Sequence, residues 1–217
     1  GKYWRVSPGG GMCASPAWSP DGRRVAFTRS LEGNSEVFIA DAAGGGVTRL
    51  THSPGIDTSP TFSPDGGQIA FTSDRSGNPQ IYVMDREGGN VRRLTFAGKQ
   101  SDSPDWSPKG DRIAFVGLLD DLFDVCTMRP DGSDLRRLTS HEGMHENPRW
   151  APDGRHLVYS KQYGGERRVY VMAADGGNLR NLTHSVHRAR YNPYWSPAGR
   201  LFAFLPGDKH LMLCTYT

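Results

Sequence analysis

The sequence predicts an all-β protein, a five-bladed β-propeller built from four-stranded antiparallel blades. Three observations predict this fold. An aromatic residue followed by Ser/Ala-Pro-x-Gly recurs five times, at steps of 44, 44, 44 and 45 residues. Glycine and proline, 27 and 15 of the 217 residues, indicate many short elements joined by turns. No segment shows the 3.6-residue apolar period over the length of a helix.

The aromatic residue of each repeat lies on the first predicted strand, which ends in the Pro-x-Gly turn. In such a turn proline presets its own φ angle and glycine accepts the left-handed conformation. A second proline stands two residues before each aromatic residue. The aromatic anchors are Trp18, Phe62, Trp106, Trp150 and Trp195.

Three more strands follow in each repeat, and the first copy illustrates them. Residues 25–27, Val-Ala-Phe, predict the second strand, and residues 37–40, Val-Phe-Ile-Ala, predict the third. The glycine pair 44–45 predicts a hairpin, and Leu50-Thr51 ends the fourth strand. A four-stranded unit of this size cannot bury both faces alone, so we expect radial stacking of the copies.

The two ends of the chain carry complementary partial repeats. Residues 3–7 match a fourth strand that lacks the three strands before it, and the last copy stops after its third strand. We therefore expect residues 3–7 to complete the last blade and close the ring, giving one domain over residues 1–217. Closure leaves no open sheet edge, and we expect a monomer. One alternative stays open: five blades cut from a six- or seven-bladed parent.

Composition excludes several functional classes. No window approaches 18 apolar residues and the N-terminus has no apolar signal region, so we expect neither membrane insertion nor a signal peptide in this chain. The 26 Lys and Arg residues barely exceed the 23 Asp and Glu residues. Arginines concentrate on the predicted fourth strands, where they protect sheet edges, so we expect no nucleic-acid partner. Three cysteines form no disulfide framework or CxxC pair.

The candidate site lies in the loops that lead from one repeat to the next. In a propeller these loops reach the mouth of the central channel, and the residues two and three positions before the repeat proline differ most between copies. Varied side chains on a constant frame are typical of a binding surface. The predicted mouth residues are Cys13, Asp57, Ser101, Asp102, His145, Glu146, Arg190 and Tyr191.

Metal binding is a further hypothesis at these loops, with a divalent cation as the only cofactor considered. Carboxylates suit calcium or magnesium, and histidines add ligands for a transition metal. The candidate ligands are Asp57, Asp102, His141, His145, Glu146 and His187. No compact metal motif joins them. No Gly-x-Ser-x-Gly, His-Glu-x-x-His or Gly-Lys-Ser/Thr motif occurs either, so we assign no catalytic residue.

The repeat phrase resembles the WD40-like PD40 repeats of TolB-type propellers. The resemblance covers residues 3–217 and rests on phrases such as residues 62–66, Phe-Ser-Pro-Asp-Gly, and residues 81–85, Ile-Tyr-Val-Met-Asp. It implies a non-enzymatic binding module, periplasmic or extracellular, that holds a protein segment or a small ligand.

The chain also departs from the TolB pattern in three respects. TolB-type propellers usually have six blades, and the α/β domain that precedes the propeller in TolB is absent from this sequence. Lys109 and Ala198 replace the turn aspartate, and Arg129 and Ala173 replace the aspartate after the third strand.

The same repeat also occurs in gating propellers of prolyl-oligopeptidase-like and tricorn proteases and in sensor domains. The alternative to a binding module is therefore a propeller enzyme or a protease-gating domain with a cation in the central channel.

Overall fold

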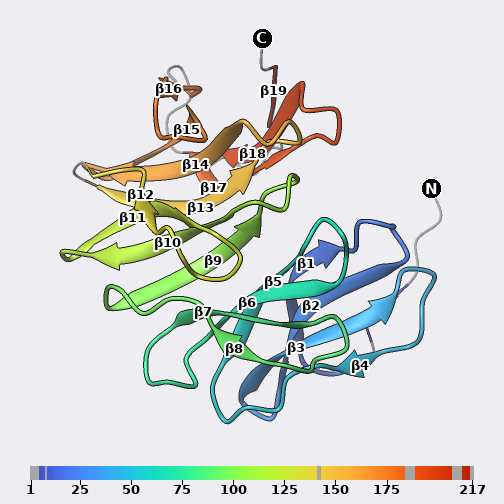
Figure 1. Cartoon of the computed structure of the whole chain (residues 1–217). Helices are drawn as coiled ribbons and strands as arrows, with labels where there is room; N and C mark the ends of the chain where they lie inside the picture. Colours follow the sequence, from blue (N-terminus) through green and yellow to red (C-terminus); the bar gives the residue numbers. More distant parts are fainter. Residues whose placement is uncertain (1–4, 8, 141–142, 184–188, 207–211, 216–217) are drawn as a thin grey trace. The chain divides into compact units, whose positions relative to one another are not determined.

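The computed structural model describes every residue except 1–4, 8, 141–142, 184–188, 207–211 and 216–217. The described residues form five antiparallel sheets joined by turns (Figure 1). The all-β propeller prediction is confirmed. Two compact units, residues 1–106 and residues 107–217, divide the chain, and the prediction of one domain stays a prediction. Among the described residues, no helix has the length and apolar character needed to cross a membrane.

Five sheets follow one another along the chain, each in the order of its strands. The first contains β1 (Met12–Trp18), β2 (Arg24–Leu31), β3 (Asn34–Asp41) and β4 (Thr48–Arg49). The second contains β5 (Asp57–Phe62), β6 (Gln68–Ser73), β7 (Gln80–Asp85) and β8 (Arg92–Arg93). The third contains β9 (Gln100–Trp106), β10 (Ile113–Leu119), β11 (Leu122–Met128) and β12 (Arg136–Arg137).

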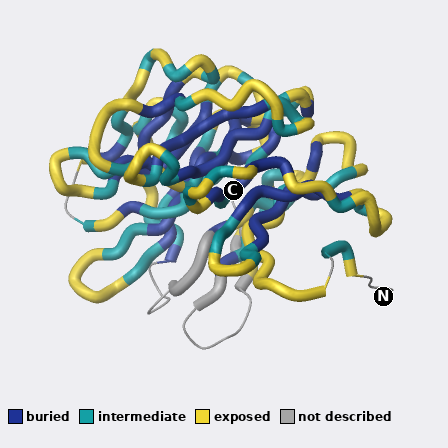
Figure 2. Tube along the Cα trace, turned by 90° about the horizontal axis from the view of Figure 1, so that it is seen from below, coloured by how far each residue is buried: buried dark blue, intermediate teal, exposed yellow. Residues whose placement is uncertain are grey.

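The fourth sheet contains β13 (Met144–Trp150), β14 (His156–Tyr163), β15 (Glu166–Ala173) and β16 (Arg180–Asn181). The fifth sheet has three strands, β17 (Ala189–Trp195), β18 (Leu201–Pro206) and β19 (Met212–Thr215). Figure 2 shows the middle strands as buried and the connecting turns as exposed. Every repeat therefore folds as a sheet of the predicted strand order.

The predicted count of five complete blades is wrong. The described residues form four four-stranded blades, and the fifth sheet has three strands. Residues 5–7 form no strand, while residues 3–4 lie outside the described part. Val6 instead packs against Phe27, Phe38 and Ala40 of the first sheet. Within the described part of the segment that was expected to complete the last blade, residues 5–7 are therefore no fourth strand, and Val6 covers a face of the first sheet instead.

Apolar faces of successive sheets form the cores. In the first unit, Ala26 and Ile39 of the first sheet pack with Phe62 and Phe71 of the second. In the second unit, Ala114 and Val125 of the third sheet share a cluster with fourth-sheet residues, including Trp150, Leu157, Tyr159 and Met172. In both clusters the alanine in the middle of the second strand, Ala26 or Ala114, lies on the face that receives the next sheet's aromatic anchor, Phe62 or Trp150.

A β-bulge interrupts the first strand of the repeat just before its proline. Ser15, Ser59, Ser103 and Asn147 have φ angles of 49°, 54°, 56° and 53°. The strand register shifts at this point in the first, second and fourth sheets. A bulge bends the strand and re-aims the side chains around it. The predicted mouth residues precede this bulge, so the bulge decides which of their side chains face inward.

The threonine of each Leu-Thr pair extends the sheet beyond the two-residue fourth strand. Its hydroxyl accepts the backbone N–H of the third strand in four sheets, at 2.9 to 3.0 Å; the threonines are Thr51, Thr95, Thr139 and Thr183. A side chain thus satisfies a buried N–H group that the short strand cannot reach. This hydrogen bond explains why a threonine follows the leucine in each of these four repeats.

The serine and aspartate of the repeat turn bond to each other. The Ser63 hydroxyl donates to Asp65, and the Gly67 N–H donates to the same carboxylate at 3.0 Å. In the third sheet, where Lys109 replaces the aspartate, the Ser107 hydroxyl donates to Asp111 at 2.8 Å. A carboxylate two residues further on thus supplies the acceptor that the repeat lacks.

Candidate functional site

The predicted mouth residues divide into buried and exposed groups. Asp57, Ser101 and His145, which occupy the same position in successive repeats, are 0%, 1% and 2% exposed. Cys13 and Asp102 are exposed, and Glu146 is half-buried. Arg190 and Tyr191 lie in β17, and their side chains are outside the described part. As a binding surface, the eight residues stay a prediction.

Asp57 lies inside the second sheet as the partner of an arginine. Its Oδ2 accepts a bond from Arg75 Nη2 at 2.9 Å, whereas its buried Oδ1 has no hydrogen-bond partner among the described residues. The Arg75 guanidinium lies 5.4 Å from the Phe71 ring centroid and 4.9 Å from that of Tyr82. Arg75 therefore covers these two rings and neutralises the buried carboxylate.

The other acidic candidates are also engaged within their own units. Asp102 accepts a bond from the Thr72 hydroxyl at 2.8 Å, and Glu146 forms an ion pair with Arg167 at 2.9 Å. The described residues contain no group of three or more His, Cys, Asp and Glu side chains placed to hold a metal ion. His141 and His187 lie outside the described part, so the cation site stays a prediction.

A buried carboxylate that the sequence did not single out organises the third sheet. Asp124 is 0% exposed and accepts bonds from Arg137 Nε at 2.8 Å and from the Thr139 hydroxyl at 2.7 Å. The same position carries Glu36 in the first sheet and Gln80 in the second, and each of these accepts a bond from its repeat threonine. The signal was present in the sequence, because a polar residue precedes the apolar third strand in each of these repeats.

His145 connects this carboxylate to a cavity. Its Nδ1 lies 3.0 Å from the Phe123 carbonyl oxygen and 3.3 Å from Asp124 Oδ1. Since a carbonyl oxygen can only accept, Nδ1 carries a proton and donates. The imidazole packs against Tyr159, with ring centroids 5.6 Å apart. His145 is therefore held in one orientation by the third sheet and by a ring of the fourth.

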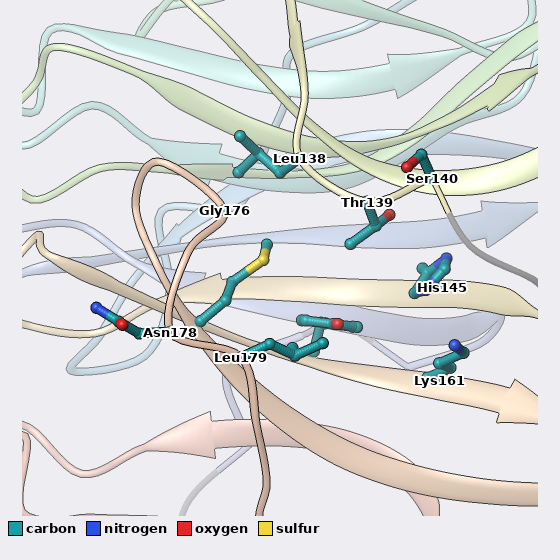
Figure 3. Close-up of a pocket in the computed structure, with 10 residues that line it drawn as sticks. Leu138, Thr139, Ser140, His145, Lys161, Gly176, Asn178 and Leu179 are labelled. Atoms are coloured by element: carbon teal, nitrogen blue, oxygen red, sulfur yellow. The ribbon is translucent and has the colours of Figure 1, made fainter.

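The cavity, called here the His145 cavity, has a volume of about 220 Å³ and lies within the second unit. Figure 3 shows His145, Lys161, Thr139 and Ser140 toward one end of it and Gly176 and Asn178 toward the other. Apolar side chains supply the rest of the lining: Leu138, Tyr159, Met172 and Leu179. The cavity thus combines an apolar wall with a polar, cationic end.

The cationic character of that end comes from Lys161. In the described part of the chain, no carboxylate is close enough to form an ion pair with Lys161, and the Asp124 carboxylate beside His145 is already paired with Arg137. Burial raises the pKa of the Tyr159 phenol, so this group stays neutral. Lys161 is therefore the charge that an incoming group would meet.

The repeat position of His145 makes this cavity possible. In the second sheet the equivalent residue is Asp57, which draws Arg75 over the aromatic rings of Phe71 and Tyr82. In the fourth sheet the residue equivalent to Arg75 is Tyr163, which is 58% exposed. Among the described residues, no arginine lies over the Tyr159 ring in the way that Arg75 lies over that of Phe71.

Sequence reasoning selected His145 but missed Lys161, Leu179 and the other lining residues. Lys161 occupies the position of Ser73 in the second repeat, so its size and charge were a visible departure from the repeat. The Leu179 side chain is 52% exposed beside the cavity. An exposed leucine in a hairpin carries no signal in one sequence, because single exposed apolar residues are common.

Comparisons with known proteins agree with the repeat and the fold. A family model described as "TolB beta propeller domain" matches residues 1–199. The crystal structure of TolB from Acinetobacter baumannii is 34% identical, with a TM-score of 0.66, over 76% of this chain and 44% of that one. A putative TolB from Agrobacterium tumefaciens is 26% identical, with a TM-score of 0.80, over 98% of this chain and 78% of that one.

A curated protein matches a shorter stretch. Tricorn protease homolog 1 of Streptomyces coelicolor is 44% identical over 52 residues, which are 24% of this chain and 5% of that protein. The chain therefore spans a small part of this curated relative and under half of the Acinetobacter TolB chain.

Proposed function

Because the chain belongs to the TolB β-propeller domain family, we propose that it is a non-enzymatic interaction module that holds a segment of a partner protein. The observation that carries the proposal is the His145 cavity, whose walls are apolar and whose one charged group is cationic. Propeller relatives from the TolB family support the same kind of partner.

The size of the cavity favours one side chain over a larger ligand. Sites for drug-sized molecules range from about 300 to 1,000 Å³, and the His145 cavity has about 220 Å³. An apolar side chain of the partner would pack against Met172 and Leu179, and a neighbouring carboxylate would pair with Lys161. The favoured occupant is therefore an apolar residue next to an acidic one in an extended segment.

Selection from a random peptide display library on the immobilised chain tests this proposal. Enriched peptides should combine an apolar and an acidic residue, and Lys161→Met or Leu179→Asp should weaken their binding by about tenfold or more, which is 1.4 kcal/mol. The matched control is Leu135→Asp, because Leu135 holds the same hairpin position in the third sheet and is 43% exposed. Equal binding to all four proteins would contradict the proposal.

The accessible mouth residues are further contact candidates in each unit by itself: Cys13 and Asp102 in the first unit and Glu146 in the second. Glu146 directly follows His145, so Glu146→Ala should weaken binding of a full-length partner more than binding of a short peptide. Equal losses for both ligands would count against a role for this loop.

We also place the protein in the periplasm or outside the cell, on the ground that TolB proteins are among its structural relatives. Fractionation of the natural host, with antibody detection of the native protein, tests this placement. Detection in the cytoplasmic fraction alone would refute it.

A protease-associated propeller is a second candidate, favoured by the 44% identity to Tricorn protease homolog 1. In this version a divalent cation binds among the predicted ligands in the loops between repeats. Metal analysis of the purified chain and a thermal-shift comparison with and without chelator test it. Absence of metal together with an unchanged melting temperature would eliminate the cation.

A further inference from the structure

The third sheet carries an arginine where the repeat has an aspartate. Asp41 and Asp85 end the third strands of the first two sheets, and Arg129 follows β11 at the same repeat position. The Arg129 side chain is 63% exposed and does not line the His145 cavity. The substitution therefore reverses a charge at the end of the third strand, and neither the core nor the proposed function accounts for it.

The charge reversal sets two arginines opposite each other. In the first sheet, Arg24 is the cross-strand partner of Asp41, and its Nε lies 4.0 Å from the aspartate Oδ1. In the third sheet, the register of β10 and β11 brings Arg112 and Arg129, the next residues beyond the last paired positions, across from each other. Like charges on facing positions of two strands repel. The third sheet therefore contains an unfavourable charge pair where the first sheet has a favourable one.

Three arginines share one carboxylate at this place. Arg136 donates to Asp134 from Nε at 3.0 Å and from Nη2 at 2.9 Å. The Arg112 guanidinium pairs with the same carboxylate, and Arg129 Nε lies 3.8 Å from it. These four residues, Arg112, Arg129, Asp134 and Arg136, are named here the Arg129 cluster. Three positive charges and one negative charge leave the cluster with an excess of two positive charges.

A second carboxylate lies near the cluster but does not pair with Arg129. Asp131 accepts the Ser133 N–H at 2.8 Å, and the bonds from Ser133, followed by the Arg129 charge, lower the pKa of Asp131. In the described part of the chain, Arg129 forms an ion pair with Asp134 alone, and its guanidinium donates no hydrogen bond to another residue. The N–H groups of Arg129 are therefore available to a ligand, as is part of Arg136, which is 55% exposed.

Arg112 and the hairpin backbone hold the cluster in place. The Arg112 side chain is 14% exposed, and its Nη1 donates to the Thr127 hydroxyl at 3.2 Å and to the Asp134 carbonyl oxygen at 3.3 Å. Asp134 has a φ angle of 52°, as Asn90 and Asn178 have at the same position in their hairpins, at 54° and 53°. One guanidinium and the shared carboxylate are thus fixed, and the two exposed guanidiniums converge on them.

We propose that the Arg129 cluster binds a phosphate group. Guanidinium groups bind phosphate oxygens through paired N–H bonds. A phosphate monoester carries about −1.5 to −2 charges at pH 7, which matches the excess of two, whereas a carboxylate would leave one positive charge. Binding relieves the repulsion between Arg112 and Arg129. The site lies within the second unit, shares no residue with the His145 cavity, and goes beyond the proposed function.

Titration of the ¹⁵N-labelled chain with inorganic phosphate at constant ionic strength tests the site. The Nε–H signals of Arg129 and Arg136, assigned from Arg129→Gln and Arg136→Gln, should shift saturably with a Kd of about 1 mM, as suits an exposed site for a small anion. The absence of a shift, or a shift that does not saturate, would overturn the proposal.

One substitution and its control show whether the charge reversal makes the site. Arg129→Asp restores the residue type of the first two sheets and should weaken phosphate binding by about tenfold or more. A melting temperature at or above that of wild type would show that this variant folds, because the new carboxylate faces Arg112. Arg180→Asp is the control, since Arg180 holds the position of Arg136 in the fourth sheet and the net charge changes equally. Equal weakening by both substitutions would overturn the proposal.

Two further probes distinguish a small free phosphate from a phosphorylated partner segment. They are the peptide Gly-Gly-phosphoserine-Gly-Gly and its unphosphorylated counterpart. Binding of the phosphopeptide more tightly than inorganic phosphate would support a phosphorylated segment, and the reverse order would support a small phosphate. Lys161→Met should leave both affinities unchanged, because Lys161 lines the His145 cavity. Loss of phosphate binding in Lys161→Met would place the anion in that cavity and overturn the proposal.

Discussion

Removal of the Asp124 carboxylate should destabilise the second unit strongly. Asp124→Ala leaves the Arg137 guanidinium, whose side chain is 27% exposed, without its buried partner. It also removes the acceptor of the Thr139 hydroxyl at 2.7 Å. Breaking a buried ion pair from one side costs about 3–5 kcal/mol. Because Arg137 retains Asp120 and the Thr139 carbonyl, we expect the lower end, about 3 kcal/mol.

Two further variants divide this loss between charge and hydrogen bonding. Asp124→Asn should keep the threonine bond, as Gln80 does with Thr95 at 2.7 Å in the second sheet, and should cost about 1–2 kcal/mol. Asp120→Ala is the matched control, because Asp120 pairs with the same Arg137 but is 84% exposed. An exposed pair contributes about 0–1 kcal/mol.

Urea unfolding monitored by circular dichroism measures these losses, provided that the slope of the unfolding free energy against urea concentration is the same for all variants. For a chain of this length, 3 kcal/mol corresponds to a melting temperature lower by about 6–12 °C. A loss below about 1 kcal/mol for Asp124→Ala, or equal losses for Asp124→Ala and Asp120→Ala, would refute the assignment of Asp124 as the organising charge.

Three other predictions concern single residues. Burial and the Asp124 charge raise the pKa of the Cys126 thiol to about 12. In a Cys214→Ser background at pH 8, iodoacetamide should therefore label the exposed Cys13 and leave Cys126 unmodified. Labelling of both cysteines in the native state would contradict this prediction. Gly88→Ala should destabilise the fold more than Gly77→Ala. Both glycines have positive φ, but only at Gly88 would an added Cβ lie 2.7 Å from the Leu50 carbonyl oxygen. Equal urea midpoints for the two variants would contradict this prediction. The bond from the Ser63 hydroxyl holds the pKa of Asp65 below its usual value. Its stabilisation of the fold is complete above the unfolded pKa of about 3.9 and is lost as pH falls through the lower folded pKa. Ser63→Ala should therefore reduce the acid dependence of the melting temperature below about pH 4, and an unchanged profile would refute the role of this bond.

The repeat made the strands and turns predictable, because each strand and turn appears several times at nearly constant spacing. Trp106 and its equivalents mark the first strand, and the glycine of the Pro-x-Gly turn has positive φ in every copy; these glycines are Gly22, Gly66, Gly110, Gly154 and Gly199. Even Lys109, an apparent defect, is compensated within the turn by Asp111. Local signals of this kind depend on few neighbours, so a sequence shows them.

The site was less predictable, because it depends on contacts between sheets. The bulge at residues such as Asn147 changes which side chains face inward, and so His145 and Asp57 are buried. The His145 cavity arises where no arginine takes the place that Arg75 has in the second sheet. The ends were misread for a similar reason, because matching strand patterns cannot show that Val6 packs on the first sheet.

Binding of a partner segment should place one of its side chains in the His145 cavity. Methyl-labelled methionine reports on it directly, because Met172 lines the cavity and is 1% exposed, whereas Met84, at 0%, lies in the core of the first unit. Titration of the labelled chain with a selected peptide should shift the Met172 methyl signal saturably and leave that of Met84 in place. Saturable binding without a change at Met172 would contradict the claim.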